Sequence, residues 1–401
     1  MDRVNTMTDP ASAASLRAEK LIPGGEALAH DAEGRVVFMR GAIPGEEVAV
    51  EIVQEKRDWS RGIVSQIHKS SPERIEAPCP QRRLGCGGCD WQHIDTAHQL
   101  RHKTEIVRDT LRRTARLESP VVHQGQSVRP FGYRTSLRVV GDQTRRASFR
   151  KERSHETVPA DQCLVAFSPL HSLLNSIEID PGLEVSLRAS EATGELTVHW
   201  DPREGTVSGL PEEVGVGRKA FLYEVVSDHR FRVSSGSFFQ SGPEAAQLLL
   251  DAVDRAAAEL KTASTVVDAY AGVGLFSVGV TQSETRVIAI ESSKWSSADC
   301  KANLANRDSL VERVRVENWR TSEPVDVVVA DPSRTGLEQR GATALASCGA
   351  PVMVLVSCDP AAMARDTVLM TALGYAHEGT EVLDLFPNTH HIECVTRFIR
   401  N

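Results

Sequence analysis

The feature that most constrains this fold is an alternation of helix-like and strand-like segments that begins near residue 243. An amphipathic stretch, PEAAQLLLDAVDRAAAEL (243–260), comes first, and five short apolar runs follow it. The runs are STVVDAY (264–270), RVIAI (286–290), VRVEN (314–318), VDVVVAD (325–331) and PVMVLVS (351–357). Because strand–helix alternation builds parallel sheets with helices on both faces, the pattern predicts an α/β fold with a doubly wound parallel sheet.

The residues before 235 follow a different pattern, with short alternating segments and frequent turn residues. A Cys- and Pro-rich segment (77–95) and an amphipathic helix at about 96–117 separate a small β-barrel from a second β-rich region at about 129–235. The predicted barrel strands are RVVFM (35–39), EVAVEIV (47–53) and RGIVSQI (61–67).

The apolar runs, the cysteines and the charges indicate whether this chain is a membrane, secreted or nucleic-acid-binding protein. No run approaches the ~20 apolar residues that a membrane span needs, and the N-terminus lacks the apolar core of a signal peptide. We therefore expect a cytoplasmic protein with a disordered tail at 1–14, whose eight cysteines are reduced thiols, metal ligands or catalysts. The net charge of −8 conceals 26 Lys and Arg against 21 Asp and Glu in residues 1–160. Basic runs at 101–117 and 129–153 suit either nucleic-acid phosphates or solvated surface faces.

A glycine-rich turn follows the first predicted strand of the α/β region. In VVDAYAGVGLFS, Asp268 ends the strand, and Gly272 and Gly274 allow a ligand to approach the backbone closely. Glu291 ends the next strand, where a carboxylate can accept both ribose hydroxyls of an adenosine. Asn318 ends the third predicted strand, within reach of an adenine edge. The arrangement indicates a nucleoside cofactor.

Two cofactors compete for such a site. An NAD fingerprint has Gly or Ala as its third small residue, whereas this chain has Ser277, and Asp268 would repel a pyrophosphate. A sulfonium cofactor with an ammonium group tolerates that acid, which favours S-adenosylmethionine over NAD. A glycine turn without any ligand is the remaining alternative.

Two further strand ends carry groups that fit methyl transfer to carbon. Asp331 ends the fourth apolar run, in VDVVVADPSR, and the residues after it lack the aromatic side chain typical of enzymes that methylate amines. Cys358 follows the fifth run, in VLVSCDP. A thiolate that adds to C6 of uracil turns C5 into a nucleophile, and a base must afterwards remove the C5 proton. Glu393 is the candidate base, with His390 and His391 as rivals. The alternatives are a cysteine that only packs in the core and a glutamate that only faces solvent.

Five motifs occur in one order along the chain: FFQ (238–240), DAYAGVG, DPSRTG, SCDPAAMARD and FPNTHHIECV. Together they make nearly the whole chain resemble the S-adenosylmethionine-dependent RNA uracil-5-methyltransferases, which act on tRNA or rRNA. The resemblance implies a Rossmann-like class I methyltransferase domain, with Cys358 as the nucleophile, Glu393 as the base and Asp331 between the cofactor and the uracil. It also implies that Gln240, Tyr270, Glu291 and Asn318 contact the cofactor, beside Asp268, Gly272, Gly274 and Asp331.

The resemblance extends to the domain plan. GAIPGEEV (41–48) is similar to part of the TRAM domain, an OB-like RNA-binding barrel. The family's equivalent of the 96–117 helix packs on the catalytic domain, and the chain has Leu275 and Asp359 where the family usually has Asn. The implied domains are the barrel at 15–70, a central β-rich domain at 71–95 and 120–235, and the methyltransferase domain at 96–119 and 236–401.

A cluster of cysteines lies at CPQRRLGCGGC, and the cysteine of ADQCLV is able to complete a set of four. Tetrahedral zinc and a [4Fe-4S] cluster both accept four thiolates, and unligated thiols are a third alternative. Zinc sites favour two closely spaced pairs, which this segment lacks, and the resemblance points to a [4Fe-4S] cluster with a structural role. The predicted ligands are Cys79, Cys86, Cys89 and Cys163.

These expectations combine into one functional hypothesis, which is C5 methylation of a uridine in folded RNA by a monomeric enzyme. The rivals are C5 methylation of cytosine, which shares the thiol addition, and a non-catalytic RNA-binding protein that retains the fold. An NAD-linked oxidoreductase is the rival with a different cofactor.

Overall fold

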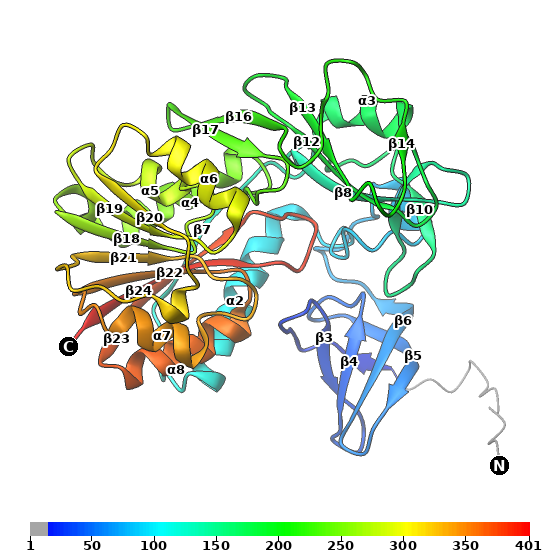
Figure 1. Ribbon diagram of the computed structural model, residues 1–401. Coiled ribbons are helices and arrows are strands. Elements are labelled where there is room, and N and C mark those ends of the chain that lie inside the picture. Colours follow the sequence, from blue (N-terminus) through cyan, green and yellow to red (C-terminus); the bar gives the residue numbers. More distant parts are fainter. Residues whose placement is uncertain (1–14) are drawn as a thin grey trace, which may run out of the picture.

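The strands gather into three lobes in a computed structural model, which describes residues 15–401 (Figure 1). An N-terminal lobe is built on residues 16–69, a central lobe on residues 136–216, and a C-terminal α/β lobe on residues 243–400. The tail predicted at 1–14 lies outside the described residues. No helix among residues 15–401 combines the length and the apolar character needed to cross a membrane.

The N-terminal lobe is a six-stranded sheet with the order β1-β5-β6-β4-β3-β2. Its inward side chains, such as Val37, Met39 and Val48, are buried, as alternation along a strand requires. Three short strands precede the three that the apolar alternation predicts. The bounds are β1 Leu16–Arg17, β2 Lys20–Leu21, β3 Ala27–His30, β4 Val36–Arg40, β5 Glu47–Glu55 and β6 Trp59–Lys69.

The central lobe holds a second six-stranded sheet, with the order β10-β9-β8-β12-β13-β15. Helix α3 packs on it through leucines that share a core with Leu137, Val139 and Val185. The bounds are α1 Pro80–Arg83, β8 Ser136–Gly141, β9 Ala147–Arg150, β10 Thr157–Pro159, α3 Ser168–Ser176, β11 Glu178–Ile179, β12 Glu184–Ala189, β13 Leu196–His199, β14 Val207–Ser208 and β15 Gly215–Val216. The strands β16 Phe221–Val226 and β17 His229–Ser234 form a separate hairpin that packs on the C-terminal lobe.

The C-terminal lobe contains an eight-stranded sheet with the order β20-β19-β18-β21-β22-β24-β23-β7. The first five strands are parallel and, numbered along the chain, follow the order 3-2-1-4-5, which confirms the predicted doubly wound α/β fold. β24 runs antiparallel between β22 and β23. The bounds are β7 Val122–Ser127, β18 Thr265–Ala269, β19 Arg286–Ile290, β20 Ser309–Glu312, β21 Val327–Ala330, β22 Val352–Ser357, β23 Tyr375–Asp384 and β24 Glu393–Arg400.

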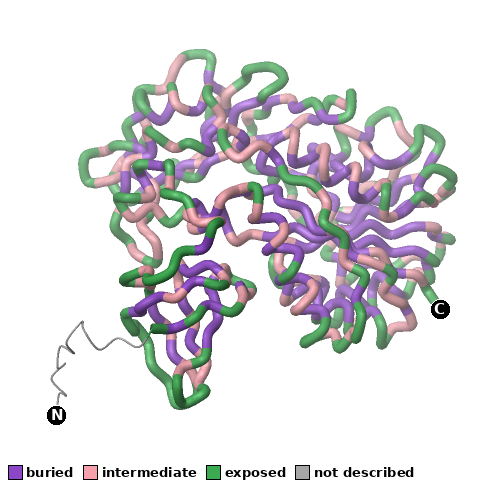
Figure 2. Tube along the Cα trace, turned by 180° about the vertical axis from the view of Figure 1, so that it is seen from behind, coloured by how far each residue is buried: buried purple, intermediate pink, exposed green. Residues whose placement is uncertain are grey.

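Helices cover both faces of this sheet, with α4, α5 and α6 on one side and α2, α7 and α8 on the other (Figure 1). The strands therefore carry near-continuous apolar runs and appear as a block of buried chain in Figure 2. The bounds are α2 Thr96–Thr114, α4 Pro243–Ala256, η2 Ala258–Lys261, α5 Leu275–Gly279, α6 Lys294–Asn303, η3 Val316–Asn318, α7 Glu338–Ala346 and α8 Pro360–Ala372.

Helix α2 comes from the middle of the chain but packs on the α/β lobe. It begins where the Asp95 carboxylate accepts a hydrogen bond from Ala97 N at 3.0 Å, and it ends at Thr114, three residues before the predicted end. Its apolar side, including Val107 and Leu111, is buried against α8 and β23. The α/β lobe is thus completed by a helix that precedes the central lobe in sequence.

One predicted strand is wrong. VRVEN (314–318) forms no strand; the third parallel strand is β20, and η3 occupies the end of the predicted segment. The earlier segment pairs because Ser309 to Glu312 align in register with Val287 to Ile290 of β19. Val316 and Trp319 instead pack into the core beside the sheet. Asn318 therefore lies on a 3₁₀ turn rather than at a strand end.

Candidate active site

Three of the predicted reacting groups lie at one edge of the α/β sheet. The parallel register of β18, β21 and β22 brings the carboxyl ends of these strands together. Asp331 follows β21 directly, and Cys358 follows β22. Because β24 is antiparallel to β22 and pairs Cys394 with Ser357, its first residue, Glu393, lies next to Cys358. This edge is where open α/β sheets bind ligands.

The Cys358 thiol is partly exposed, and its pKa is raised to about 12. Burial is the main cause, the negative charges of Glu393 and Asp331 add to it, and the Arg334 guanidinium opposes it. The three predicted catalytic residues thus lie close enough together for the charges of Glu393 and Asp331 to raise the pKa of the Cys358 thiol. A thiol with this pKa is protonated at neutral pH, so it becomes a nucleophile only when a positive charge or a base assists it.

Glu393 and Asp331 are neighbouring carboxyl groups with unusually high proton affinity. Burial raises the pKa of Glu393 well above its usual range, and the charge of Asp331 raises it further. Burial, and then the charge of Asp268, raises the pKa of Asp331 to about 7. Two close carboxylates that are shielded from water do not both ionise readily, so the pair holds a proton near neutral pH. Such a pair is suited to general acid–base chemistry.

Asp359, the residue after the thiol, caps a helix. Its side chain accepts a hydrogen bond from Ala362 N at 2.7 Å at the N-terminus of α8. The raised pKa of Cys358 originates from burial and from Glu393 and Asp331. The cap therefore fixes the turn that presents the thiol.

The glycine-rich turn after β18 has a backbone that leaves room for a ligand. Tyr270, Gly272 and Gly274 have φ angles of 64°, 56° and 87°, and the space where a Gly272 Cβ would stand is open. Beneath the turn, Asp268 Oδ2 accepts hydrogen bonds from Ser277 N at 2.8 Å and from Ser277 Oγ at 2.5 Å. Its Oδ1 has no partner among residues 15–401, so this buried oxygen is free to accept from a ligand.

Of the other predicted cofactor residues, Glu291 contacts this turn, whereas Asn318 and Gln240 have other surroundings. Glu291 Oε2 accepts a hydrogen bond from Gly272 N at 2.9 Å and so holds the turn from the neighbouring strand. Asn318 lies beside α7, where its Oδ1 accepts from Arg340 at 3.4 Å, and Gln240 is buried between β17 and α4. Within residues 15–401 no hydrogen bond joins Asn318 or Gln240 to the carboxylates of the site.

Comparison with known proteins identifies the family. A protein of Streptomyces avermitilis named as an uncharacterized RNA methyltransferase is 34% identical to this chain, over 93% of this chain and 94% of its own. The chain belongs to this family of RNA methyltransferases. A Gloeobacter violaceus relative with the same designation is 32% identical over 95% of both chains. No family model matches the sequence.

The methyltransferase also shares its fold with a solved structure. The crystal structure of Pyrococcus abyssi tRNA (uracil-54, C5)-methyltransferase in complex with S-adenosyl-L-homocysteine superposes with a TM-score of 0.73, over 96% of this chain and 100% of that chain. The two sequences are 23% identical, so the likeness shows a common fold with a Rossmann-like domain.

The four cysteines predicted as metal ligands line one cavity of 420 Å³ in the methyltransferase. All four are free thiols, and burial together with the Cys163 thiol raises the pKa of Cys89 to about 12. No three His, Cys, Asp or Glu side chains among residues 15–401 converge closely enough to hold a single metal ion. Four thiolates around one cavity are the donor set of both a tetrahedral zinc ion and a [4Fe-4S] cluster. The set is Cys79, Cys86, Cys89 and Cys163.

Basic side chains surround this thiol cavity. One acid, Glu152, lies among them and is paired with Arg40 and Arg82 at 3.0 Å each. Four of these basic residues are also paired with carboxylates, Arg82 with Glu152, Arg150 with Glu184, Lys151 with Glu156 and Arg153 with Glu26, so the cavity has less free positive charge than its lining indicates. The basic residues are Arg82, Arg134, Arg138, Arg150, Lys151 and Arg153.

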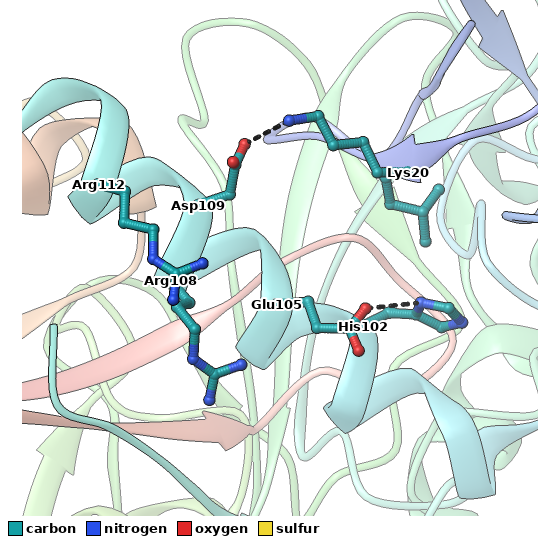
Figure 3. A pocket seen from close by; sticks show the side chains of 7 residues that line it. Lys20, His102, Glu105, Arg108, Asp109 and Arg112 are labelled. Carbon is teal, nitrogen blue, oxygen red and sulfur yellow. Dashed lines mark hydrogen bonds and ion pairs between the residues drawn. The ribbon is translucent and has the colours of Figure 1, made fainter. Parts of the chain in front are cut away.

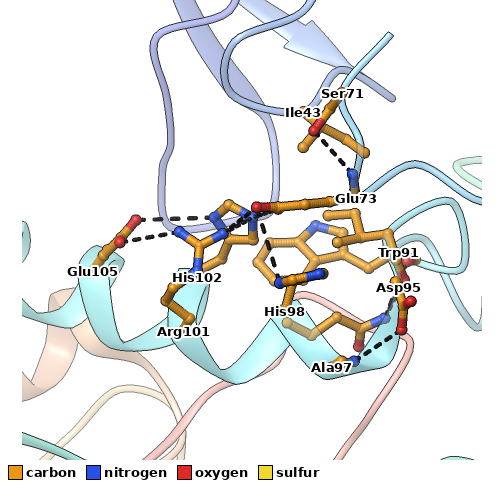
Figure 4. Close-up of polar contacts among 12 residues, drawn as sticks. Ile43, Ser71, Glu73, Trp91, Asp95, Ala97, His98, Arg101, His102 and Glu105 are labelled. Carbon is orange, nitrogen blue, oxygen red and sulfur yellow. Dashed lines mark hydrogen bonds and ion pairs between the residues drawn. The ribbon is translucent and has the colours of Figure 1, made fainter.

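The basic run at 101–117 is less available to phosphates than its sequence indicates. Lys103 is fully buried, and its Nζ donates to Asp384 Oδ1 at 2.7 Å. The Glu73 carboxylate contacts Arg101 at 2.5 Å and the His102 ring at 2.6 Å (Figure 4). These side chains are paired with carboxylates of the protein, at the junction of α2 with the segment that follows the N-terminal lobe, although the Arg101 side chain is 42% exposed.

A second part of the same helix faces the N-terminal lobe. Lys20 of β2 pairs with Asp109 at 2.9 Å beside a cavity of 200 Å³ (Figure 3). Arg108 and Arg112 line that cavity, and Arg108 donates to Val122 O at 3.2 Å. Helix α2 thus connects the two lobes through paired charges.

Sequence patterns missed the residues that hold the loop before Glu393. Asp90, Gln99 and Lys103 each contact residues between 384 and 390. One signal was present for Lys103, because its position places it on the same helix side as the apolar Leu100 and Val107. The other contacts join residues about three hundred positions apart and leave no local pattern.

Proposed function

We propose that this RNA methyltransferase transfers a methyl group from S-adenosylmethionine to C5 of a uridine in folded RNA. The observation that carries the proposal is the meeting of Cys358 with Glu393 and Asp331 at the sheet edge that also bears the glycine-rich turn. A thiol adds nothing to the methylation of an amine or a hydroxyl, whereas it activates a pyrimidine carbon by adding to the carbon beside it. A neighbouring group with high proton affinity supplies the base that this reaction needs.

Each step of the proposed reaction uses a group of this site. Beside the positive charge of the bound cofactor, Cys358 loses its proton to solvent, and its Sγ bonds to C6 of the flipped-out uracil while the C5=C6 electron pair moves to C5 and the C4 carbonyl oxygen. Bound S-adenosylmethionine supplies the electrophilic methyl group that C5 takes. Glu393 then removes the C5 proton, the C5=C6 bond forms again, and the C6–S bond breaks with its electron pair returning to sulfur.

The raised pKa values suit these roles. Glu393 with a raised pKa is a strong base once it is ionised. Asp331, with a pKa of about 7, exchanges a proton readily where the cofactor and the target base meet. The protonated Cys358 thiol reacts little with other electrophiles until RNA and a positively charged cofactor are in place.

We assign the cofactor to the glycine-rich turn and the strand ends around it. The unpartnered Asp268 Oδ1 and the open space at Gly272 support this assignment, because they fit the cationic group and the close approach of such a ligand. Asp331 adds a second carboxyl group on the side of the thiol. The residues proposed to hold S-adenosylmethionine are Gln240, Asp268, Tyr270, Gly272, Gly274, Glu291, Asn318 and Asp331.

We further propose that the four thiols hold a [4Fe-4S] cluster with a structural role. Their position around one cavity supports this assignment, together with the resemblance of the cysteine pattern to that of the RNA uracil-5-methyltransferases. Protein purified without oxygen should contain about four irons and matching sulfide per chain. A Cys86→Ser variant should lose iron, whereas Cys348→Ser, which alters a free thiol elsewhere, should retain it. One zinc ion without sulfide would contradict the assignment.

RNA is the proposed partner, and the chain would act as a cytoplasmic monomer. The domain plan proposed from the sequence has a TRAM-type RNA-binding barrel at 15–70 and a central domain at 71–95 and 120–235. Residues 96–119 and 236–401 would form the methyltransferase domain. The packing of α2 on the α/β lobe supports this division, whereas β7 (122–127) of the proposed central domain pairs with β23 in the α/β sheet.

The reaction is tested by trapping the covalent intermediate. RNA that contains 5-fluorouridine should form a stable adduct with the wild-type protein and S-adenosylmethionine, because the base cannot remove fluorine from C5. Cys358→Ala should form none, whereas Cys348→Ala, a control at a similarly exposed free thiol, should react normally. Equal trapping by Cys358→Ala would refute the assignment of the nucleophile. Trapping by 5-fluorocytidine instead of 5-fluorouridine would indicate a cytosine-C5 methyltransferase.

A further inference from the structure

The loop between β23 and β24, residues 385–392, ends at the proposed base and is held by a residue far away in sequence. Asp90 Oδ1 accepts a hydrogen bond from His390 N at 3.1 Å, and Asp90 Oδ2 lies 2.8 Å from His390 Nδ1. Both side chains are partly shielded, with 21% and 33% of their surface exposed. One carboxylate therefore grips both the backbone and the ring of His390, three residues before Glu393.

The same loop is fixed a second time at Asn388. Its N–H donates to Gln99 Oε1 at 2.6 Å, its carbonyl accepts from Trp91 N at 2.9 Å, and its Nδ2 donates to Pro130 O at 2.9 Å. Asn388 has a φ of 67°, in the left-handed region, so these contacts hold a backbone conformation that most residues avoid. The loop is thus set by its surroundings and not by its own preference.

The segment that grips the loop is the one that carries the thiols. Asp90 directly follows Cys89, and Trp91 comes next. A turn of the N-terminal lobe covers this contact: a Cβ on Gly25 would lie 2.5 Å from His390 Cβ and 2.8 Å from Trp91 Nε1. Three separate parts of the chain therefore meet around His390.

We propose that Asp90 is a positioning residue. Through its two contacts with His390, it would hold the Glu393 carboxylate toward C5 of the target uracil. The inference rests on the proposed function, because it assigns Glu393 to the removal of the C5 proton. It also gives the cysteine-rich segment (77–95) a role in the reaction, because the folded state of that segment would determine the position of the Glu393 carboxylate.

The inference separates two steps of the reaction. Cys358 is presented by β22 and by the α8 cap, which do not include the loop at 385–392. Loss of the Asp90 contact should therefore spare the addition of the thiol to C6 and the methylation of C5. Removal of the C5 proton should slow, because a general base that is displaced by a fraction of an ångström loses much of its effect.

The test compares these two steps in Asp90→Ala, Asp90→Asn and Glu393→Gln. With 5-fluorouridine RNA the adduct forms without proton removal, so its rate reports on thiol addition and methyl transfer. With ordinary RNA the turnover and the amount of covalent protein–RNA complex report on proton removal. Asp308→Ala is the matched control, because it removes an aspartate that pairs with Arg286 at 2.6 Å at the opposite edge of the sheet.

We expect Asp90→Ala to form the fluorinated adduct within about 2-fold of the wild-type rate while its turnover falls by about 10- to 100-fold. Covalent complex with ordinary RNA should accumulate, as it should in Glu393→Gln. Asp90→Asn retains one acceptor oxygen and should fall between Asp90→Ala and the wild type. In Asp90→Ala, amide hydrogen exchange should quicken at residues 386–393 and remain unchanged in β18 and β21.

Two results would overturn the inference. Equal losses in adduct formation and turnover would show that Asp90 only maintains the fold, and normal turnover in Asp90→Ala would show that the contact is dispensable. Failure of the proposed function looks different, because the wild-type protein would then form no adduct or Glu393→Gln would turn over normally.

Discussion

Replacing Lys103 by Met tests whether the buried Asp384 carboxylate, which precedes the loop at 385–392, depends on its cationic partner. The Lys103 side chain is fully buried and the Asp384 side chain is 2% exposed, with 2.7 Å between Nζ and Oδ1. Lys103 Nζ also donates to Phe386 O at 3.2 Å, inside the loop that leads to Glu393. Lys103→Met leaves the Asp384 carboxylate buried with one remaining donor, Phe386 N at 3.1 Å.

Breaking a buried pair by removing one partner lowers the free energy of unfolding by about 3–5 kcal/mol. If the loop opens locally, this loss corresponds to about 10²- to 10⁴-fold faster amide exchange in the protected part of residues 384–393. Native-state hydrogen exchange with mass spectrometry measures this region directly, which avoids assuming that a chain of several lobes unfolds in one step.

Lys20→Met is the matched control. Lys20 pairs with Asp109 on the same helix at 2.9 Å, but the two side chains are 39% and 37% exposed, so the loss should be about 0–1 kcal/mol. Lys103→Met/Asp384→Asn removes both charges and should recover most of the stability. Equal effects of Lys103→Met and Lys20→Met would refute the reasoning from burial.

The remaining predictions concern the thiol, the cap and the RNA. Alkylation of Cys358 should be slow at pH 7 and should quicken about 10-fold per pH unit toward its pKa of about 12; Glu393→Gln should lower that pKa, since it removes a negative charge that raises it. Asp359→Ala should lower stability by about 1 kcal/mol in urea unfolding, whereas Asp359→Asn should retain the cap. Arg138→Gln and Arg150→Gln, at exposed positions by the thiol cavity, should weaken RNA binding. In binding titrations at several salt concentrations, each should reduce the slope of log K against log salt concentration by about 1.

The sequence predicted the α/β fold because strand and helix periods are local properties. Runs such as 325–331 and 351–357 are apolar throughout, and only a strand covered on both faces needs that pattern. The strand at 314–318 was misplaced because Val314 and Val316 alternate with charged residues as a strand would, while the pairing register of β19 selected Ser309–Glu312. Register depends on a partner strand, which a single segment does not reveal.

The candidate site was predictable to the extent that strand ends converge. Asp331 and Cys358 follow parallel strands, so a common edge brings them together whatever the loops do. The place of Glu393 required the antiparallel β24, and the surroundings of its loop required Asp90 and Gln99. Neither Asp90 nor Gln99 was identified by a motif, because a hydrogen bond between distant segments imposes no spacing on the sequence.

The proposed nucleophile and the proposed base are held by different parts of the chain. Residues 236–401 contain the glycine-rich turn, Cys358 and Glu393, but the loop before Glu393 takes its shape from contacts with the cysteine-rich segment and α2. Under the proposed mechanism, the folded N-terminal half would set the geometry of proton removal, while the C-terminal half would set that of thiol addition. If the proposed roles hold, this methyltransferase needs its N-terminal half for a catalytic step as well as for any contact with RNA.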